Sequence, residues 1–490
     1  MKKVKIILLS LLSVVAILLP FFSVFAVVVI TPPQYSDTFV GVLDEKYERL
    51  HSIEEEKIVV VGGSSVAFGL DSAALESYTG MPVVNFGLYA ALGTKLMLDL
   101  SDSGINKGDI VILAPELDPQ TLSLYFNSRT TLEAIDDNYK MMLDIGVDNW
   151  FNLFGGMWSF AGDKLERAAS DTPMLLDPVY RAENINSYGD FAMPRPENTM
   201  AKWYDPNTPV ELTTDVLGAD FDEFCDYLNK YIAKLKLKGA KVYFSYCPIN
   251  EMALTENTTD AAKAEFVRYL EDNINCDFIS DIDDYILEAG YFFDTNFHLN
   301  DAGVSVRTSR LAMDLINRDE LDIVGIPVAD EPAAPALPGY EILYMGPEDP
   351  NAAYFTYDLV EDGAYAGAYV ITGLSELGKT QTELTVPVGA DGLKVVSVAA
   401  GAFADGSVKR LNIPTDTNLK LFENGSFADS GIETMYFYTT GFPYIAPPAD
   451  FYGVSLDFVL HIPEGMNVSG LYEWSQRGLV IEDDVVFPLH

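Results

Sequence analysis

The chain has 490 residues, and its 31 basic and 73 acidic side chains give a formal net charge of −42. About half of the residues are apolar, which excludes a mainly disordered chain and provides for a sizeable core. The acidic excess argues against nucleic acid and against anionic lipid as partners, because both require clustered Lys and Arg. A chain of this length is expected to form more than one domain.

The N-terminus predicts a membrane anchor. Residues 6–30 carry no charged side chain, and about 20 apolar residues are enough to cross a bilayer. The stretch "SVFA" could serve as a cleavage site, but the apolar run continues beyond it, so we expect an uncleaved helix. The three lysines before the run predict a cytoplasmic N-terminus. We therefore expect residues 1–30 to form a signal-anchor transmembrane helix in the cell membrane, with the bulk of the chain extracellular.

Residues 31–328 are expected to form one domain: a short polar stretch comes first, and from residue 57 to about 325 strand-like and helix-like segments alternate. Helical spacing of apolar residues is clear in "DEFCDYLNKYIAKLKLKGA", and short apolar runs lie between such stretches. The strand-like runs are "KIVVV", "PVVNFG", "DIVILAP", "KVYFSYCP" and "CDFIS". Strands that alternate with helices predict an α/β fold of three layers, with a parallel sheet covered on both faces. Residues 120–210 form an insert that this pattern does not assign.

A linker and a second domain follow. Residues 329–339, "ADEPAAPALPG", are rich in Pro and Ala and predict a semi-rigid linker. Residues 340–490 are β-rich, and "VVSVAAGAFADGSVKRLNIP" aligns with "LKLFENGSFADSGIETMYFY" at a spacing of 24 residues. The aligned apolar pairs are Phe403 and Phe427, Val408 and Ile432, Leu411 and Met435, and Ile413 and Phe437. Such a period is typical of a leucine-rich solenoid, and these residues resemble the BspA-like repeats of bacterial surface proteins. That resemblance implies binding or display.

Two serines raise the question of catalysis. Ser64 and Ser65 follow the run "KIVVVGG", at the carboxyl end of a predicted parallel strand, where ligands of α/β proteins bind. The simpler interpretation is a strand–turn–helix junction in which a serine caps the helix. A serine nucleophile also needs a base and an acid that orients the base. Of the four histidines, His51 precedes the first predicted strand, and only His298 lies among the alternating strands and helices, with Asp294 four residues before it. The alternative for His298 is a capping or surface histidine.

These blocks resemble the SGNH, or GDSL-like, hydrolase superfamily. The resemblance makes Ser65 the nucleophile, with Ser64 as the alternative, and it makes Asp294 and His298 its partners. The family places its Asp three positions before its His, whereas here the spacing from Asp294 to His298 is four, and Asn296 could shape the same loop. The second block, "VVNFG", supplies Asn85 and Gly87. The resemblance then implies an oxyanion hole that includes the N–H groups of Ser65 and Gly87, together with Asn85.

The third block departs from the family. The family has an Asn whose side chain donates to the oxyanion, whereas "IVILAPELD" places Glu116 there. An ionised carboxylate donates no hydrogen bond, and the loss of one donor can cost about 10²–10³ in rate. We keep Glu116 as a candidate for substrate binding, together with Asn250 in the loop after "KVYFSYCP". The alternative for Asn250 is an ordinary strand-to-helix connection.

The chain also resembles the membrane-anchored SGNH-like proteins of Gram-positive bacteria, through "TPPQYSDTF" and "FHLNDAG". Such proteins are similar to the D-alanine transfer protein and to polysaccharide O-acetylation factors. The resemblance implies an esterase or O-acyltransferase of envelope polysaccharide or cell-wall polymers, beside a multi-spanning membrane O-acyltransferase, with no metal or organic cofactor. The rival hypothesis is a non-catalytic, degenerate domain that binds glycans while the repeats mediate adhesion. The irregularly spaced Cys225, Cys247 and Cys276 predict buried thiols that bridge in at most one pair.

Overall fold

A computed structural model describes most of the chain. The described residues are 19–20, 22–169, 179–321, 323, 325–423, 425–439, 444–445, 458–463 and 479–482. The chain divides into two compact units, the first of which comprises residues 1–174, 179–196 and 210–335. The second unit comprises residues 175–178, 197–209 and 336–490. The break after Pro335 lies inside the linker that the sequence predicts.

The first unit contains a parallel sheet of five strands. Its spatial order is β2-β1-β3-β4-β6, and every neighbouring pair is parallel. The strands are β1 (Ile58–Gly62), β2 (Val83–Gly87), β3 (Ile110–Leu113), β4 (Lys241–Phe244) and β6 (Asp277–Phe278). Each of the five apolar runs in the sequence therefore supplies one strand, and the predicted α/β fold with a parallel sheet is confirmed.

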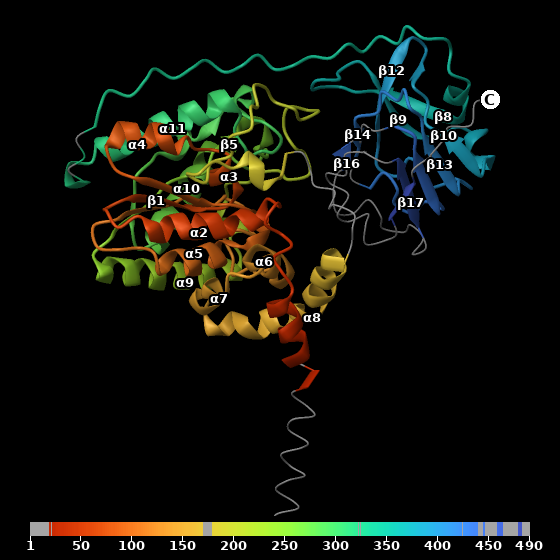
Figure 1. The fold of residues 1–490 in the computed structure, drawn as a ribbon. Coiled ribbons are helices and arrows are strands. Elements are labelled where there is room, and N and C mark those ends of the chain that lie inside the picture. The colour runs from red at the N-terminus through yellow and green to blue at the C-terminus, as the bar shows by residue number, and fades with distance from the viewer. Residues whose placement is uncertain are drawn as a thin grey trace, which may run out of the picture. The chain divides into compact units, whose positions relative to one another are not determined.

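Helices cover both faces of this sheet (Figure 1). On one face lie α4 (Ser72–Thr79) and α11 (Asp301–Ile316), and on the other lie α2 (Leu43–Ser52), α5 (Thr94–Asp102) and α9 (Ala219–Lys238). Ile58 and Val60 of β1 pack in one core with Leu75 of α4 and Leu311 of α11. All five residues of β1 are buried, as expected for a strand that is covered on both faces.

Shorter elements complete the first unit. They are α3 (Ser64–Ala67), α6 (Ser128–Ile135), α7 (Tyr139–Asp144), α8 (Val147–Ala169), α10 (Asp260–Asn273), and the paired β5 (Ile249–Asn250) and β7 (Ile286–Leu287). Helices α6 to α8 occupy the insert that the sequence pattern does not assign. Residues 22–30 are also helical. Of the anchor predicted over residues 1–30, residues 1–18 and 21 lie outside the described residues, and no helix in the described part is long and apolar enough to cross a membrane.

The second unit is β-rich, as predicted. Its strands are β8 (Phe355–Leu359), β9 (Tyr369–Leu374), β10 (Glu383–Thr385), β11 (Gly389–Ala390), β12 (Leu393–Val398), β13 (Arg410–Ile413), β14 (Leu421–Phe422), β15 (Thr434–Phe437), β16 (Tyr444–Ile445), β17 (Val459–Pro463) and β18 (Leu479–Glu482). One sheet has the order β10-β13-β15-β17-β18, and the other runs β16-β14-β12-β9-β8. Most neighbours are parallel, since each turn of chain lays its strand beside the previous one.

The spacing of 24 residues reappears as strand register. Leu411 pairs with Met435 and Ile413 with Phe437, where β13 lies parallel to β15. The ring centroids of Phe403 and Phe427 lie 5.7 Å apart, and the two ring planes are nearly parallel, with an angle of 2° between them. These apolar side chains belong to one buried core, so each copy of the repeat buries its apolar edge against the next.

One segment of the insert groups with the second unit. The indole N–H of Trp203 donates to the carbonyl of Pro338 at 2.9 Å, and the N–H of Ala364 donates to the carbonyl of Ala201 at 2.8 Å. Residues 197–209 thus depart from the domain boundary placed at 328. These two hydrogen bonds join residues more than 130 positions apart, which no local pattern in the sequence indicates.

Candidate functional site

The two serines lie where β1 gives way to α3. The strand ends at Gly62, and α3 begins at Ser64 after Gly63. A side chain at Gly63 would place its Cβ 2.3 Å from the Glu116 carboxylate, so the close approach of that carboxylate requires glycine. Ser65 is fully buried, whereas Ser64 retains 8% exposure. The turn is therefore shaped around Glu116, which reaches it from the end of β3.

His298 and Asp294 are hydrogen-bonded to each other. Nδ1 of His298 lies 2.8 Å from Oδ1 of Asp294, and the hydroxyl of Tyr180 donates to Oδ2 of Asp294 at 2.7 Å. The side chain of Thr295 accepts the backbone N–H of His298 at 3.0 Å, which closes the loop tightly. With Nδ1–H donating to the carboxylate, Nε2 becomes the ring nitrogen that can accept a proton.

Phe68 joins the histidine loop to the serine turn. Its ring lies 4.0 Å from the imidazole of His298 with an angle of 5° between the planes, and the N–H of Phe68 donates to the carbonyl of Ser64 at 2.9 Å. The buried guanidinium of Arg195 donates to the carbonyls of Phe68 at 2.9 Å and Leu299 at 2.6 Å. The structure thus brings the two segments together, although 230 residues separate them in the sequence.

The groups around Ser65 differ in how they are bonded. Its N–H donates to Oε1 of Glu116 at 2.7 Å, and its carbonyl accepts a hydrogen bond from Arg307. Its Oγ, like Oε2 of Glu116, is buried without a hydrogen-bond partner among the described residues. Burial of an unpartnered polar atom is costly, so these two atoms need an explanation beyond packing.

Asn85 and Gly87 are engaged with one another. Gly87 donates its N–H to Oδ1 of Asn85 at 3.1 Å. The amide group of Asn85 donates to the carbonyl of Val66 at 2.9 Å and to Oδ1 of Asp190 at 2.8 Å. In this conformation the N–H groups that the resemblance assigns to an oxyanion hole, on Ser65 and Gly87, both have protein acceptors. An oxyanion would have to displace Glu116 and Asn85 from them.

A buried charge cluster lies behind Asn85. The ammonium of Lys46 donates to the carbonyls of Asn85 at 3.2 Å and of Gly189. Burial lowers the pKa of Lys46 to about 7, an effect that the nearby Asp190 partly offsets. Burial also raises the pKa of Asp190, although hydrogen bonds from Ser72 and Asn85 oppose that shift. The cluster therefore binds both the backbone carbonyl and the side-chain amide group of Asn85.

Asn250 lies beside the histidine loop. Its backbone N–H donates to the carbonyl of Asn296 at 3.0 Å. Its side-chain oxygen accepts the N–H of Met252 at 3.1 Å, so the amide also caps the short 3-10 helix that follows β5. Asn250 thus shares the carboxyl edge of the sheet with Ser65, Glu116 and His298.

Sequence reasoning missed the two buried arginines that fasten this site. Arg195 lies in the unassigned insert, and nothing in its local pattern distinguishes it. Arg307 lies on α11 between buried Val304 and Leu311, in the apolar stripe of that helix. A lone charge at such a position is a readable signal, because a buried arginine must find acceptors. Burial lowers the pKa of both guanidinium groups, that of Arg195 to about 10.

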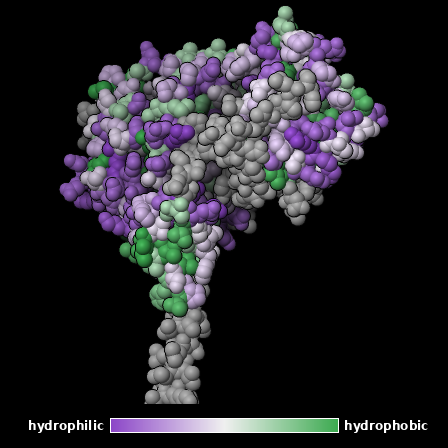
Figure 2. All heavy atoms as spheres, turned by 45° about the vertical axis from the view of Figure 1, so that its right-hand side comes forward, coloured by the Kyte–Doolittle hydropathy of each residue, from purple (hydrophilic) through white to green (hydrophobic). Residues whose placement is uncertain are grey.

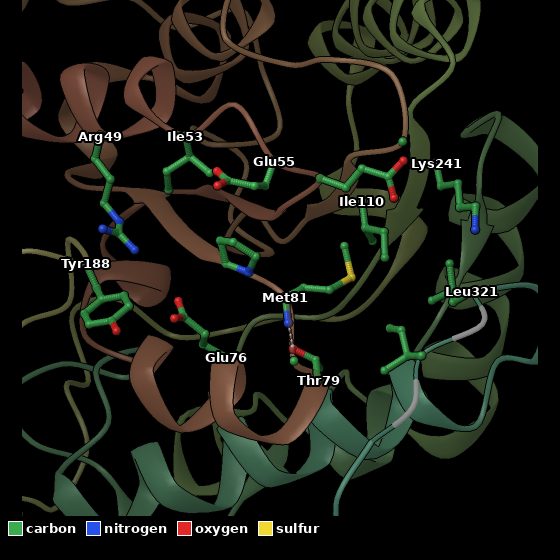
Figure 3. A pocket seen from close by; sticks show the side chains of 15 residues that line it. Arg49, Ile53, Glu55, Glu76, Thr79, Met81, Ile110, Tyr188, Lys241 and Leu321 are labelled. Atoms are coloured by element: carbon green, nitrogen blue, oxygen red, sulfur yellow. Dashed lines mark hydrogen bonds between the residues drawn. The ribbon is translucent and has the colours of Figure 1, made fainter.

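A cavity of about 1020 Å³ lies at the opposite, amino-terminal edge of the sheet (Figure 3). Arg49, Tyr188 and Glu76 face one another across one side of it, and Lys241 lies on the other. None of the candidate site residues lines this cavity. Arg49 donates to the carbonyl of Val83 at 2.8 Å and stacks over Tyr188, so it has a structural role at the start of β2.

The other candidate chemistries find little support in the described residues. No group of three or more His, Cys, Asp or Glu side chains is placed there to hold a metal ion. Cys225, Cys247 and Cys276 are free and buried, and burial raises the pKa of each thiol to about 12. A thiol with so high a pKa is a poor nucleophile at neutral pH.

Comparison of the chain with protein-family models, with curated proteins and with solved structures finds no match. The functional argument therefore depends on the motifs and on the geometry described above.

Proposed function

We propose that the first unit is an SGNH-like serine esterase or O-acyltransferase that acts outside the cytoplasm on acyl esters of envelope polysaccharides or cell-wall polymers. One observation carries the proposal: the imidazole of His298, which is hydrogen-bonded to Asp294, stacks on Phe68, one helical turn from the serines. A histidine oriented by a carboxylate beside an N-terminal helix serine is the arrangement that acyl transfer needs.

In this mechanism Ser65 Oγ attacks the acyl carbonyl, and Nε2 of His298 takes the hydroxyl proton. His298 then returns that proton to the leaving alcohol, while Asp294 stabilises the positive charge on the ring. The acyl-serine is released by water in hydrolysis or by a sugar hydroxyl in transfer. Ser65 is buried, its Oγ makes no hydrogen bond to His298 among the described residues, and its N–H is bound to Glu116, so productive binding requires a shift of the serine turn. Ser64, which is slightly exposed, is the alternative nucleophile.

The direct test is hydrolysis of a short aryl acetate by the Ser65→Ala and Ser64→Ala variants. We expect Ser65→Ala to lower kcat/KM by about 10³-fold or more, since loss of a nucleophile removes the covalent route. Ser64→Ala should change it by less than about tenfold. The reverse order would identify Ser64 as the nucleophile, and unchanged turnover in both variants would refute the esterase proposal.

A second candidate function is a non-catalytic domain that binds glycans. The contact between Glu116 and the N–H of Ser65 favours it, because a carboxylate stands where negative charge would develop in acyl transfer. A fluorophosphonate probe separates the candidates. An activated serine should be labelled within minutes, and this labelling should disappear in the His298→Ala variant. A degenerate site should stay unlabelled in both proteins.

The remaining assignments complete the proposal. The second unit would be a repeat domain of the leucine-rich, BspA-like type that serves in display or adhesion. Residues 1–30 would anchor the chain as a single-pass protein of the cell membrane. A multi-spanning membrane O-acyltransferase would be its partner if the reaction is transfer. The parallel pairing at 24-residue spacing and the uncharged run over residues 6–30 support these assignments.

A further inference from the structure

Helix α8 (Val147–Ala169) has two apolar faces rather than one. The first face packs inward, and its buried side chains, Leu153, Met157 and Phe160, recur at helical spacing. The second face is exposed and consists of four residues at spacings of four, three and four. These are Val147, Phe151, Phe154 and Trp158, which we call the exposed stripe.

The exposed stripe is unusual for a helix of a globular unit. Phe151 is 86% exposed and Phe154 is 47% exposed. A surface helix normally presents polar residues on the side away from the core. On α8 the exposed polar residues, such as Asn152 and Ser159, occupy a separate sector of the helix. An ordered apolar row of this kind marks an interaction surface.

Helix α8 lies beside the helical residues 22–30, and this position indicates what the exposed stripe contacts. The side chains of Lys164 on α8 and of Tyr139 on α7 both donate to the carbonyl of Val28, at 3.3 Å and 3.4 Å. Val28 belongs to the helical residues 22–30, which end the uncharged run over residues 6–30. In Figure 1 the first part of α8 runs across the direction of that helix, at the same end of the unit.

Apolar surface from both helices gathers at this end. Phe22, Phe25 and Ile30 of the N-terminal helix are exposed as well. Figure 2 shows apolar side chains concentrated where the N-terminal helix meets the rest of the first unit. A chain segment that enters a bilayer here would bring the exposed stripe to the lipid surface.

We propose that α8 lies in the outer interface of the bilayer, with the exposed stripe inserted among the lipids, as a second membrane contact. The inference rests on the proposed membrane anchor and not on the proposed esterase. Lys164 is turned inward to an ion pair with Asp136 at 2.6 Å, and the guanidinium of Arg167 lies over the ring of Tyr35 at 4.5 Å, so both basic groups of this helix are engaged within the first unit. The contact is therefore apolar, and zwitterionic lipid suffices for it.

Spin labels on the full-length chain test this proposal. Single cysteines would replace Phe151 or Phe154 in the exposed stripe, and Asn152 or Ser159 on the polar sector as matched controls. The native cysteines are buried, so they compete little for the label. The chain is reconstituted in phosphatidylcholine vesicles, and collision of the label with oxygen, which enters lipid, is compared with collision with a water-soluble nickel chelate.

We expect a several-fold higher ratio of oxygen to nickel collisions at positions 151 and 154 than at 152 and 159. Equal, water-like ratios at all four positions on a chain that floats with the vesicles would overturn the inference and leave the anchor standing. A chain that does not float would overturn both. Dipolar broadening between labels at position 151, with low collision rates for both reagents, would show that a second copy covers the face and would also overturn it. Aryl acetate turnover of the same variants is measured separately, because the inference does not rest on the proposed esterase.

Discussion

His298 has one ring nitrogen committed to Asp294, and this commitment decides which nitrogen can accept a proton. The Asp294→Asn variant keeps the size of the side chain. It replaces the carboxylate that accepts the hydrogen bond of the His298 ring with a neutral amide. We expect kcat for aryl acetate to fall by about 10⁴-fold, because the wrong tautomer and an unstabilised imidazolium result.

Tyr180 provides the control for this variant. It donates to the other oxygen of Asp294, so Tyr180→Phe removes a hydrogen bond to the same carboxylate without changing its charge. We expect less than about a tenfold loss of kcat in that variant. Equal losses in the two variants would show that Asp294 acts through packing of the loop alone.

Lys46 makes stability depend on pH. Burial lowers its pKa from 10.5 to about 7 in the folded chain. Between these values the unfolded chain binds the proton and the folded chain does not, so a rise in pH through this window stabilises the fold. We expect the free energy of unfolding, measured with urea, to rise between pH 7 and 9 by about 1 kcal/mol per pH unit relative to Lys46→Met.

The buried neighbour of Lys46 acts in the opposite sense. Burial raises the pKa of Asp190, so the folded chain holds that proton to higher pH than the unfolded chain, and stability falls as pH rises through the folded-state pKa of that carboxyl. Subtracting the Lys46→Met curve gives the contribution of the lysine together with its electrostatic coupling to Asp190. Parallel curves between pH 7 and 9 would mean that Lys46 stays protonated in the folded chain.

Among the elements, β1 and β3 are fastened at their amino ends by a fully buried ion pair. Lys57 Nζ lies 2.9 Å from Oδ2 of Asp109, and both side chains have no exposure. Oδ1 of Asp109 accepts the backbone N–H of Lys57 at 3.2 Å, so the carboxylate also orders the start of β1. The pair therefore belongs to the framework of the sheet rather than to the candidate site at its other edge.

Breaking this pair should cost much more than replacing it. Asp109→Asn leaves a buried ammonium without its counter-charge, and we expect a loss of about 3–5 kcal/mol in the free energy of unfolding. The double variant Lys57→Met/Asp109→Leu should recover most of that loss, because no buried charge remains. Urea unfolding of Lys57→Met, of Asp109→Leu and of the double variant measures the coupling between the two side chains. Simple additivity of the two single changes would contradict this account.

At the scale of the whole molecule, residues 197–209 depend on the second unit for their order. Trp203 donates to Pro338, and Ala201 accepts from Ala364. A chain that ends at Pro335 lacks both partners. We expect trypsin to cut after Lys202 at least about tenfold faster in that chain than in the full-length protein, as cleavage follows local opening.

Cleavage after Lys230 serves as the internal control. That lysine lies on α9, and its helix belongs entirely to the first unit. Its rate of cleavage, followed by mass spectrometry, should be the same in both chains. Faster cutting at Lys230 as well would show that the first unit needs the second for its own folding, whereas equal cutting at Lys202 would show that the segment is held within the first unit.

The sequence by itself determined the architecture at the level of strands and repeats. The run "KIVVV" and its four counterparts became neighbouring parallel strands, because short apolar runs between helical segments are stable only as covered strands. The pairing of Leu411 with Met435 followed from period alone, since each copy buries its apolar edge on the next. Asp294 and His298 lie on one short loop, so their proximity was readable as well.

Only the tertiary structure decided how the serine turn is bonded. Ser65 meets Glu116 across 51 residues, Asn85 meets Asp190 across 105, and Arg195 spans 127 residues to reach Phe68. Which buried donor finds which acceptor depends on side chains that come together only after the sheet has assembled. Periodicity carries information about which face of an element is buried, but it carries none about these partners, and for that reason the state of the N–H groups at the candidate site could not be predicted.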